Sequence, residues 1–316
     1  MNAITATGLR RSYGDTEVLK GVDLNVRRGT VFSLLGANGA GKTTTVKILS
    51  TLISAHGGSA SVAGHDVAGD PDSVRGAIGV TGQFSAVDNL MTGRENLKLM
   101  ADLHHLGKAD GRRRADQLLE QFDLVDAADK SAVTYSGGMR RRLDLAMTLV
   151  GSPEVIFLDE PTTGLDPRSR RTMWQIVREL VASGVTIFLT TQYLEEADEL
   201  ADRIAVLDHG KVVAEGTADE LKRRIPGGHV LLQFTDPRHL EAATRIVRDA
   251  SRDGESLALR VPSDGSVRAL KALLDRLDEN SVLVDSLSTH TPDLDDVFLA
   301  LTGKPEAAAQ KKVTLS

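Results

Sequence analysis

The stretch VFSLLGANGAGKT, residues Val31 to Thr43, decides the fold of this chain. Its apolar beginning predicts a buried strand, and the helical spacing of apolar residues over Thr43–Ile53 predicts a helix that follows the glycine-rich turn. Gly36–Thr43 fits the pattern G-x-x-x-x-G-K-[ST], in which backbone N–H groups and a lysine surround phosphate groups. The sequence therefore predicts a phosphate-binding loop between a strand and a helix.

The side chains of this loop predict a nucleotide site. Lys42 supplies a positive charge between the β- and γ-phosphates, and the Thr43 hydroxyl is a candidate Mg²⁺ ligand. An ordinary glycine turn that opens a helix is the alternative, but it does not explain Lys-Thr at the required position. The expected nucleotide-binding residues of the loop are Gly36, Asn38, Gly39, Ala40, Gly41, Lys42, Thr43 and Thr44.

A second apolar stretch, Val155–Leu158, ends in the two carboxylates Asp159 and Glu160. It predicts a buried strand whose carboxyl end lies where open α/β sheets bind their ligands. Asp159 is a candidate for holding Mg²⁺ through water, and Glu160 is a candidate acceptor of the proton of the water that attacks the γ-phosphate. Acidic residues commonly follow strands, so this pair becomes informative through its combination with Lys42.

Short apolar strands alternate with helical stretches through the first two-thirds of the chain. Further strands are predicted at Ile78–Thr81 and Val185–Thr190, whereas residues 85–150 show helical patterns such as Leu97–Leu103, Arg113–Phe122 and Met139–Leu149. This alternation predicts an α/β fold with a mostly parallel sheet covered on both faces. The helical subdomain at about residues 85–150 is expected to be an insertion into that sheet domain.

Ile225-Pro226-Gly227-Gly228 predicts a domain boundary, because proline and paired glycines follow a charged helix. The predicted domains are residues 1–225, a small α+β accessory domain at 226–303, and a flexible tail at 304–316. In the accessory domain, strands are expected over Val230–Phe234, Ser256–Val261 and Val282–Leu287, and helices over His239–Ala250, Ser266–Leu277 and Leu294–Leu301.

Composition limits the classes of function. The 316 residues carry a net charge of −6 and include no cysteine, which excludes disulfides and thiolate chemistry and argues against a nucleic-acid binder held by bulk charge. No apolar run approaches the roughly 20 residues that span a bilayer, and no signal-peptide pattern is visible at the N-terminus. Any membrane role is therefore expected to need a partner chain.

Acidic residues surround the arginine runs 112–114 and 140–142, which are interpreted as solvated surface.

Tyr135-Ser136-Gly137-Gly138-Met139-Arg140 precedes a predicted helix, with Ser136 as its N-cap. Lys42, Ser136-Gly137-Gly138 and Asp159-Glu160 follow one another along the chain in the order found in the ATP-binding subunits of ABC transporters. Residues 1–220 therefore resemble those subunits. The resemblance implies a P-loop NTPase fold with an antiparallel β edge, an ATPase activity, and ATP and Mg²⁺ as cofactors. A P-loop kinase or a GTPase switch would leave Ser136, Gly137 and Gly138 unexplained.

Three further residues acquire roles through this resemblance. Tyr13 matches the aromatic residue that stacks on adenine, although a lone tyrosine there would more often be a packing residue. Gln83 matches the glutamine that touches Mg²⁺ and reports the nucleotide state. Asp166, in Thr163-Gly164-Leu165-Asp166, matches the segment that crosses the dimer interface. It could equally be the N-cap of a helix that has Pro167 at its first position.

Gln192 is a departure from the family pattern, because most relatives carry a histidine there that contacts the γ-phosphate. A glutamine can donate a hydrogen bond to phosphate but cannot gain a charge, so Glu160 becomes the expected general base. Either the site is slow or the chain belongs to a subgroup that works with glutamine. We favour the second interpretation, because TQYLEEAD at residues 191–198 and the segment Leu294–Gly303 resemble the daunorubicin-resistance type.

The resemblance also implies partners, because the chain has one phosphate loop and one Ser-Gly-Gly segment. In the family, the Ser-Gly-Gly of one subunit closes on the γ-phosphate held by another, which implies a head-to-tail homodimer. A separately encoded multi-helix membrane permease is the expected second partner, which places this chain at the cytoplasmic face of the cell membrane. No nucleic acid is expected as a partner.

The implied function is ATP-driven export of a hydrophobic antibiotic, drug or lipid. The alternative is a soluble ABC-type ATPase that acts on ribosomes or DNA; a single cassette without sustained heptads argues against it.

Overall fold

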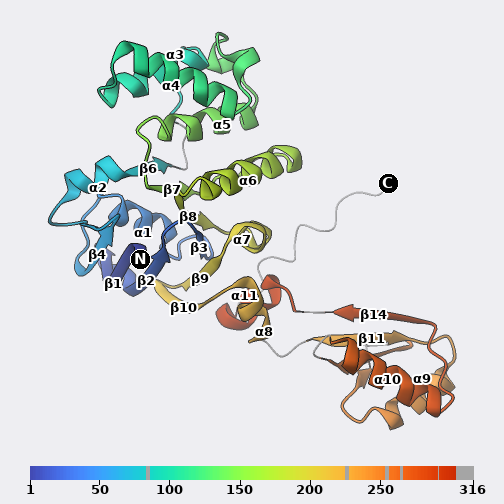
Figure 1. Cartoon of the computed structure of the whole chain (residues 1–316). Coiled ribbons are helices and arrows are strands. Elements are labelled where there is room, and N and C mark those ends of the chain that lie inside the picture. The colour runs from blue at the N-terminus through green and yellow to red at the C-terminus, as the bar shows by residue number, and fades with distance from the viewer. Residues whose placement is uncertain (83–85, 225–227, 253–255, 264–265, 291, 304–316) are drawn as a thin grey trace. The chain divides into compact units, whose positions relative to one another are not determined.

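The computed structural model describes residues 1–82, 86–224, 228–252, 256–263, 266–290 and 292–303 (Figure 1). The chain divides into two compact units, Met1–Ala218 and Asp219–Ser316. Residues 225–227 of the predicted boundary, and the predicted tail at 304–316, lie outside the described residues.

A mostly parallel sheet forms the centre of the first unit, with the strand order β10-β9-β3-β8-β7-β6. Neighbouring strands from β9 to β6 are parallel, and β10 is antiparallel to β9. All residues of β3, β7 and β8 are buried, which is typical of a parallel sheet covered on both faces. The α/β prediction is confirmed. The strands are β3 (Val31–Leu35), β6 (Ile78–Thr81), β7 (Val155–Asp159), β8 (Thr186–Thr191), β9 (Arg203–Asp208) and β10 (Lys211–Gly216).

An antiparallel sheet with the order β2-β1-β4-β5 accompanies the central sheet. Its strands are β1 (Asn2–Tyr13), β2 (Thr16–Arg27), β4 (Gly57–Val62) and β5 (His65–Asp66). Apolar side chains of this sheet, such as Leu24, share one buried cluster with Phe32 of β3 and Val46 of helix α1 (Lys42–Leu49). This sheet is the antiparallel β edge that the family resemblance implied.

The helical insertion consists of α3 (Gly93–Leu103), α4 (Lys108–Gln121) and α5 (Gly137–Thr148), which lie together between β6 and β7 in the chain (Figure 1). Apolar residues from all three helices, among them Leu97, Leu118 and Leu143, belong to one buried cluster. Helices therefore make up most of the described residues between β6 and β7. The other helices of this unit are α2 (Pro71–Ala77), α6 (Pro167–Ala182) and α7 (Leu194–Leu200), with short 3-10 turns at Val125–Ala127 and Ala132–Thr134.

The second unit is an α+β structure with its own apolar core. Its antiparallel sheet has the order β12-β13-β11-β14, and the core includes Leu232 and Leu259 from the sheet and Leu240 and Leu273 from the helices. The strands are β11 (His229–Gln233), β12 (Ser251–Arg252), β13 (Ala258–Pro262) and β14 (Ser286–His290). The helices are α9 (Pro237–Ile246), α10 (Val267–Glu279) and α11 (Leu294–Thr302), and α8 (Ala218–Arg223) begins where the first unit ends.

Several predicted elements end or begin elsewhere, among them helix α1 and the last strand of the second unit. Helix α1 stops at Leu49 instead of Ile53, because Thr51 has a φ of 63°, in the left-handed region that a helix cannot contain. The strand expected at Val282–Leu287 is displaced to Ser286–His290. Val282 instead packs into the core directly after α10, where its N–H donates to the carbonyl of Leu277 over 3.0 Å.

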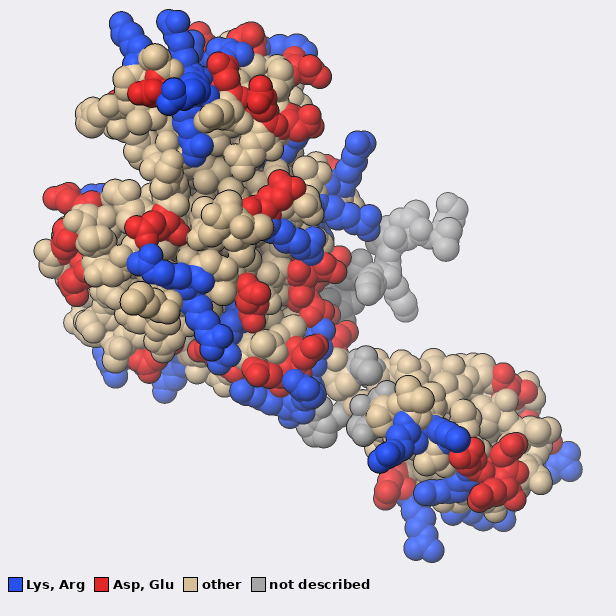
Figure 2. All heavy atoms as spheres, viewed as in Figure 1, with Lys and Arg blue, Asp and Glu red and all other residues tan. Residues whose placement is uncertain are grey.

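The charged surface agrees with the even charge distribution of the sequence. Lys and Arg side chains are interspersed with Asp and Glu over the visible face of both units (Figure 2). Within the described ranges, no helix is long and apolar enough to cross a bilayer.

Candidate functional site

Two glycines of the phosphate loop, Gly36 and Gly41, are required by close packing. A Cβ on Gly36 would lie 2.4 Å from the carbonyl oxygen of Leu207, and one on Gly41 would lie 2.6 Å from the Leu19 side chain. Gly41 also has a φ of 114°, which L-residues rarely adopt. Directly after it, α1 begins at Lys42 without a side-chain cap for its first N–H groups. A helix N-terminus with uncapped N–H groups favours an anion.

Lys42 is buried at the centre of the candidate site, with 4% of its surface exposed. Its ammonium donates to the carbonyls of Gly36 and Ala37 over 2.8 and 3.2 Å and lies 3.5 Å from a carboxylate oxygen of Glu160. Burial lowers the pKa of Lys42, while the negative charges of Glu160 and Asp159 oppose that shift. The ammonium is therefore held close to both carboxylates that follow the strand β7.

Asp159 and Glu160 lie at the carboxyl end of β7, and both are buried. The Asp159 carboxylate accepts a hydrogen bond from the hydroxyl of Thr190 on the neighbouring strand β8. The N–H of Glu160 donates to the Thr190 carbonyl over 3.0 Å. Glu160 has a φ of 51°, a left-handed conformation that costs a non-glycine residue about 1–2 kcal/mol. Strain of this kind is typical of functional sites. The structure thus brings together Lys42, Asp159 and Glu160, as predicted.

The remaining loop residues and Tyr13 differ in their exposure to solvent. Asn38 and Gly39 are exposed, Ala40 is buried, and Thr43 and Thr44 are partly buried in the first turn of α1. Tyr13, at the end of β1, is 47% exposed. The guanidinium of Arg11 lies 5.1 Å from the centre of its ring. The tyrosine ring is therefore available for stacking.

Ser136, Gly137 and Gly138 form the N-terminus of α5. The Ser136 hydroxyl accepts from the N–H of Met139 over 3.2 Å, so Ser136 is the N-cap. Ser136 and Gly137 are exposed. A Cβ on Gly138 would lie 2.5 Å from the Ser169 hydroxyl of α6, so this glycine permits close packing of the two helices.

Three further predicted residues have different outcomes. Asp166 is the N-cap of α6: its carboxylate accepts from the N–H groups of Arg168 and Ser169, each over 3.0 Å, and from the Ser169 hydroxyl over 2.6 Å. These hydrogen bonds, above all those from Ser169, lower the pKa of Asp166. Gln192 is partly buried between β8 and α7. Gln83 lies outside the described residues.

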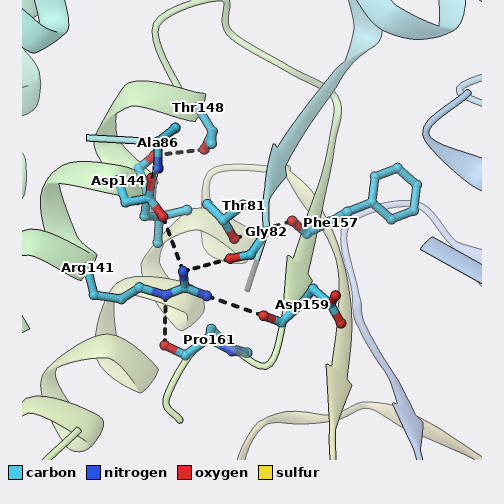
Figure 3. Close-up of polar contacts among 10 residues, drawn as sticks. Thr81, Gly82, Ala86, Arg141, Asp144, Thr148, Phe157, Asp159 and Pro161 are labelled. Atoms are coloured by element: carbon cyan, nitrogen blue, oxygen red, sulfur yellow. Dashed lines mark hydrogen bonds and ion pairs between the residues drawn. The ribbon is translucent and has the colours of Figure 1, made fainter. Parts of the chain in front are cut away.

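Arg141 is a largely covered residue that the sequence interpretation placed on the solvated surface, and that interpretation is wrong. Its side chain is 12% exposed. Its Nε donates to the Pro161 carbonyl over 2.9 Å, and Nη2 donates to the Asp159 carbonyl over 3.4 Å (Figure 3). Nη1 donates to the Gly82 carbonyl over 3.0 Å and to a carboxylate oxygen of Asp144 over 3.1 Å. Burial lowers the pKa of Arg141, and the charge of Asp144 opposes the shift.

The arginines of the run 112–114 also differ in their exposure to solvent. Arg112 and Arg113 are exposed, as expected, but Arg114 is half-buried and donates to the Leu149 carbonyl over 2.6 Å. The one available sequence signal for Arg141 was Asp144, at the i+3 position of a predicted helix, where opposite charges meet.

Comparisons with known proteins agree with this geometry. The profile of a family described as "ABC transporter" matches residues 19–163. The chain is 50% identical over 303 residues to daunorubicin resistance ATP-binding protein DrrA3 of Streptomyces coeruleorubidus, covering 95% of this chain and 96% of that protein. It is 48% identical over 323 residues to daunorubicin/doxorubicin resistance ATP-binding protein DrrA of Streptomyces peucetius, covering 98% of each. A solved ATP-binding subunit of an ABC transporter matches with a TM-score of 0.63 and 30% identity, over 70% of this chain and 92% of that chain.

Proposed function

This chain belongs to the ATP-binding subunits of ABC transporters, in the daunorubicin-resistance group, and from this membership we propose that it powers the export of a hydrophobic small molecule through a separate membrane subunit. The chain is an ATPase. The proposed cargo class, an antibiotic, drug or lipid, is supported by relatives named for resistance to daunorubicin and doxorubicin. Both relatives match across the second unit as well, which favours an exporter over the soluble ATPase that acts on ribosomes or DNA.

One observation supports the proposed chemistry: a buried lysine of the phosphate loop lies beside two buried carboxylates at the carboxyl end of β7. Lys42 lies 3.5 Å from Glu160, and the Asp159 charge acts on the same ammonium. Burying a charge is costly unless it is paired. A phosphate group that enters the loop offers Lys42 a stronger partner than the Gly36 and Ala37 carbonyls it now binds. We therefore assign Lys42 to the β- and γ-phosphates of ATP.

The residues present fit a magnesium ion. The Asp159 carboxylate and the Thr43 hydroxyl are oxygen ligands of the kind that Mg²⁺ prefers. Asp159 is the last residue of β7, and Thr43 lies in the first turn of α1. Gln83 is the third proposed ligand. When bound, the ion neutralises negative charge on the phosphate oxygens.

Glu160 is the proposed general base. Its carboxylate accepts the proton of the attacking water, while Lys42 stabilises the charge that develops on the transferred phosphoryl group. Gln192 can donate a hydrogen bond to the γ-phosphate but cannot take up a proton. Proton acceptance therefore falls to Glu160, in agreement with a subgroup that normally works with glutamine.

A head-to-tail homodimer is the proposed working form. Ser136 and Gly137 are exposed at the N-terminus of α5, where helix N–H groups can bind the γ-phosphate held by a second copy. A Cβ on Gly137 would meet nothing within 4 Å, so this position is open to a partner. We assign Asp166 to the same interface and Tyr13 to the adenine ring.

The membrane subunit can be tested by expressing the chain together with the membrane protein encoded by the neighbouring reading frame. If the proposal holds, the chain sediments with membranes only when that protein is present, at their cytoplasmic face, and daunorubicin raises ATP hydrolysis. The same membranes with Glu160→Gln show no drug-stimulated hydrolysis, which controls for contaminating ATPases. A chain that stays in the supernatant, with hydrolysis indifferent to hydrophobic drugs, would refute the export function.

A further inference from the structure

The guanidinium of Arg141 holds the chain on both sides of Glu160 (Figure 3). Its Nη2 binds the carbonyl of Asp159, directly before Glu160, and its Nε binds the carbonyl of Pro161, directly after it. The distances are 3.4 and 2.9 Å. One rigid, planar group therefore restrains the backbone before and after the proposed general base.

Glu160 is a residue whose backbone needs such a restraint. Its φ of 51° is unfavourable for a side chain with a Cβ, and such a conformation persists only where the surroundings determine it. The N–H of Glu160 is held by the Thr190 carbonyl on β8. Arg141, from α5, restrains the same segment by donating hydrogen bonds to the carbonyls of Asp159 and Pro161.

The same arginine connects α5 to the end of β6. Nη1 donates to the Gly82 carbonyl and to Asp144, and the Asp144 carboxylate accepts from the N–H of Ala86 over 2.9 Å. Asp144 is 2% exposed, so this ion pair is one of the buried kind whose disruption is costly. Lysine cannot replace the arginine here, because its ammonium is a point charge without the planar fork of donors.

We propose that Arg141 is a positioning residue for ATP hydrolysis, which keeps the Glu160 carboxylate directed at the attacking water by fixing the peptide groups on both sides of it. This inference rests on the proposed role of Glu160. It also connects the Ser136–Gly138 terminus of α5 with the general base of the same chain, because Arg141 belongs to the second turn of that helix.

The test compares Arg141→Lys with Arg142→Lys in the full-length chain. Lysine at position 141 keeps a cation beside Asp144 but loses the carbonyl contacts. We expect kcat for ATP to fall by about 10- to 100-fold, with KM within threefold of wild type. Unhydrolysed ATP should remain bound after rapid gel filtration. Arg142 donates instead to the Phe122 and Asp123 carbonyls, over 2.7 and 3.1 Å, so Arg142→Lys should keep kcat within twofold.

Two further measurements keep the outcome decisive. Arg141→Gln, in which the amide can still bind one carbonyl, should lose kcat in the same way, so that a folding defect of one variant does not decide the result. Unchanged kcat in both Arg141 variants, or a kcat loss that is matched by loss of ATP binding, would overturn the positioning role. Glu160→Gln is measured beside them. If it turns over ATP normally, the general-base assignment fails and the inference fails with it. If only Glu160→Gln is inactive, the inference alone fails.

Discussion

The two units differ in what they bury. Every buried polar or charged side chain among the described residues lies in the first unit, including Lys42, Asp144, Asp159, Glu160 and Glu196. In the described part of the second unit, by contrast, the buried side chains are apolar, as in the cluster around Leu232 and Leu259. Burying polar groups costs free energy unless they are paired, and in the first unit Lys42, Asp159 and Glu196 all have hydrogen-bond partners.

This difference indicates that the candidate catalytic groups are confined to the first unit. Several buried polar groups of the first unit lie at the carboxyl ends of β7 and β8, beside the phosphate loop, where Asp159 and Thr190 contact each other and Lys42 faces Glu160. The second unit has a core of the ordinary kind, and we expect it to act through its surface. The comparison predicts that changes in the first unit alter catalysis, whereas matched changes in the second alter stability alone.

The largest expected effect is that of Glu160→Gln. The amide keeps the size of the side chain but cannot accept a proton, so kcat should fall by about 100- to 10,000-fold. Binding of ATP should persist, and the ATP-bound dimer should accumulate. Single-turnover hydrolysis and size-exclusion chromatography with ATP measure the two effects.

The matched control is Glu241→Gln in the second unit. Glu241 is exposed and forms an i,i+4 ion pair with Arg245, so its loss should leave hydrolysis unchanged. A Glu160→Gln variant with the wild-type rate would refute the general-base assignment and remove the main contrast between the units.

A core truncation in each unit gives the next largest effect. Leu232 of β11 and Leu189 of β8 are both fully buried, and replacement of either by alanine should lower the free energy of unfolding of its own unit by about 2–5 kcal/mol. ATP should raise the melting temperature of the first unit only, because ligand binding stabilises the part that binds it. Calorimetry with and without ATP assigns the transitions. Loss of hydrolysis in Leu232→Ala, with the first transition unchanged, would show that the second unit takes part in the chemistry.

The sequence was most informative where local pattern and function coincide. Val31–Leu35 and Val155–Asp159 are continuous apolar runs, and the structure makes both of them buried strands. In contrast, the residues of β14, Ser286–His290, are largely exposed at the edge of their sheet. They carry no apolar pattern, so the predicted strand followed the apolar run that starts at Val282. Val282 and Val284 of that run pack against the core, and this packing does not make the run a strand.

Arg141 marks the limit of prediction at the candidate site. Arg140, Arg141 and Arg142 are chemically identical neighbours, and only the packing of α5 against the strand ends decides which of them contacts the backbone around Glu160. The loop lysine was predictable, because the spacing of its motif specifies a phosphate site, and the two carboxylates became informative in combination with it. The residue that holds Glu160 in place was not, because the groups through which it acts on Glu160 are backbone carbonyls, which leave no trace in the sequence.

A pH effect of intermediate size is expected from Glu196, which is fully buried in the first unit. Thr162 and Trp174 donate to its carboxylate over 2.8 and 3.3 Å, but desolvation dominates and raises its pKa. The folded state then binds a proton more tightly than the unfolded state. The contribution of Glu196 to stability is therefore fully present below the unfolded pKa and is lost as pH rises through the folded pKa.

Glu196→Gln should remove this dependence. The free energy of unfolding of wild type falls with a slope of up to about 1.4 kcal/mol per pH unit within that interval, and the variant should lack that component. Denaturant unfolding from pH 4 to 8 measures it. Glu195→Gln, at the exposed neighbouring position, is the control and should follow the wild-type curve. If the Glu196 and Glu195 variants have the same pH profile, burial of Glu196 does not govern the stability of this unit.

The smallest effect compares two helix caps. Asp166 caps α6 in the first unit, and Asp236 caps α9 in the second by accepting from the N–H of Arg238 over 2.8 Å. Loss of an N-cap by Asp→Ala should lower the melting temperature of the first unit by about 2–4 °C and of the smaller second unit by about 4–8 °C. Asn is nearly as good a cap as Asp, so Asp166→Asn should keep the stability. If Asp166 also serves the dimer interface, Asp166→Asn lowers ATP hydrolysis while Asp236→Asn does not. If both Asn variants hydrolyse ATP at the wild-type rate, Asp166 is a cap alone, and the two units differ at the strand ends but not at their helix termini.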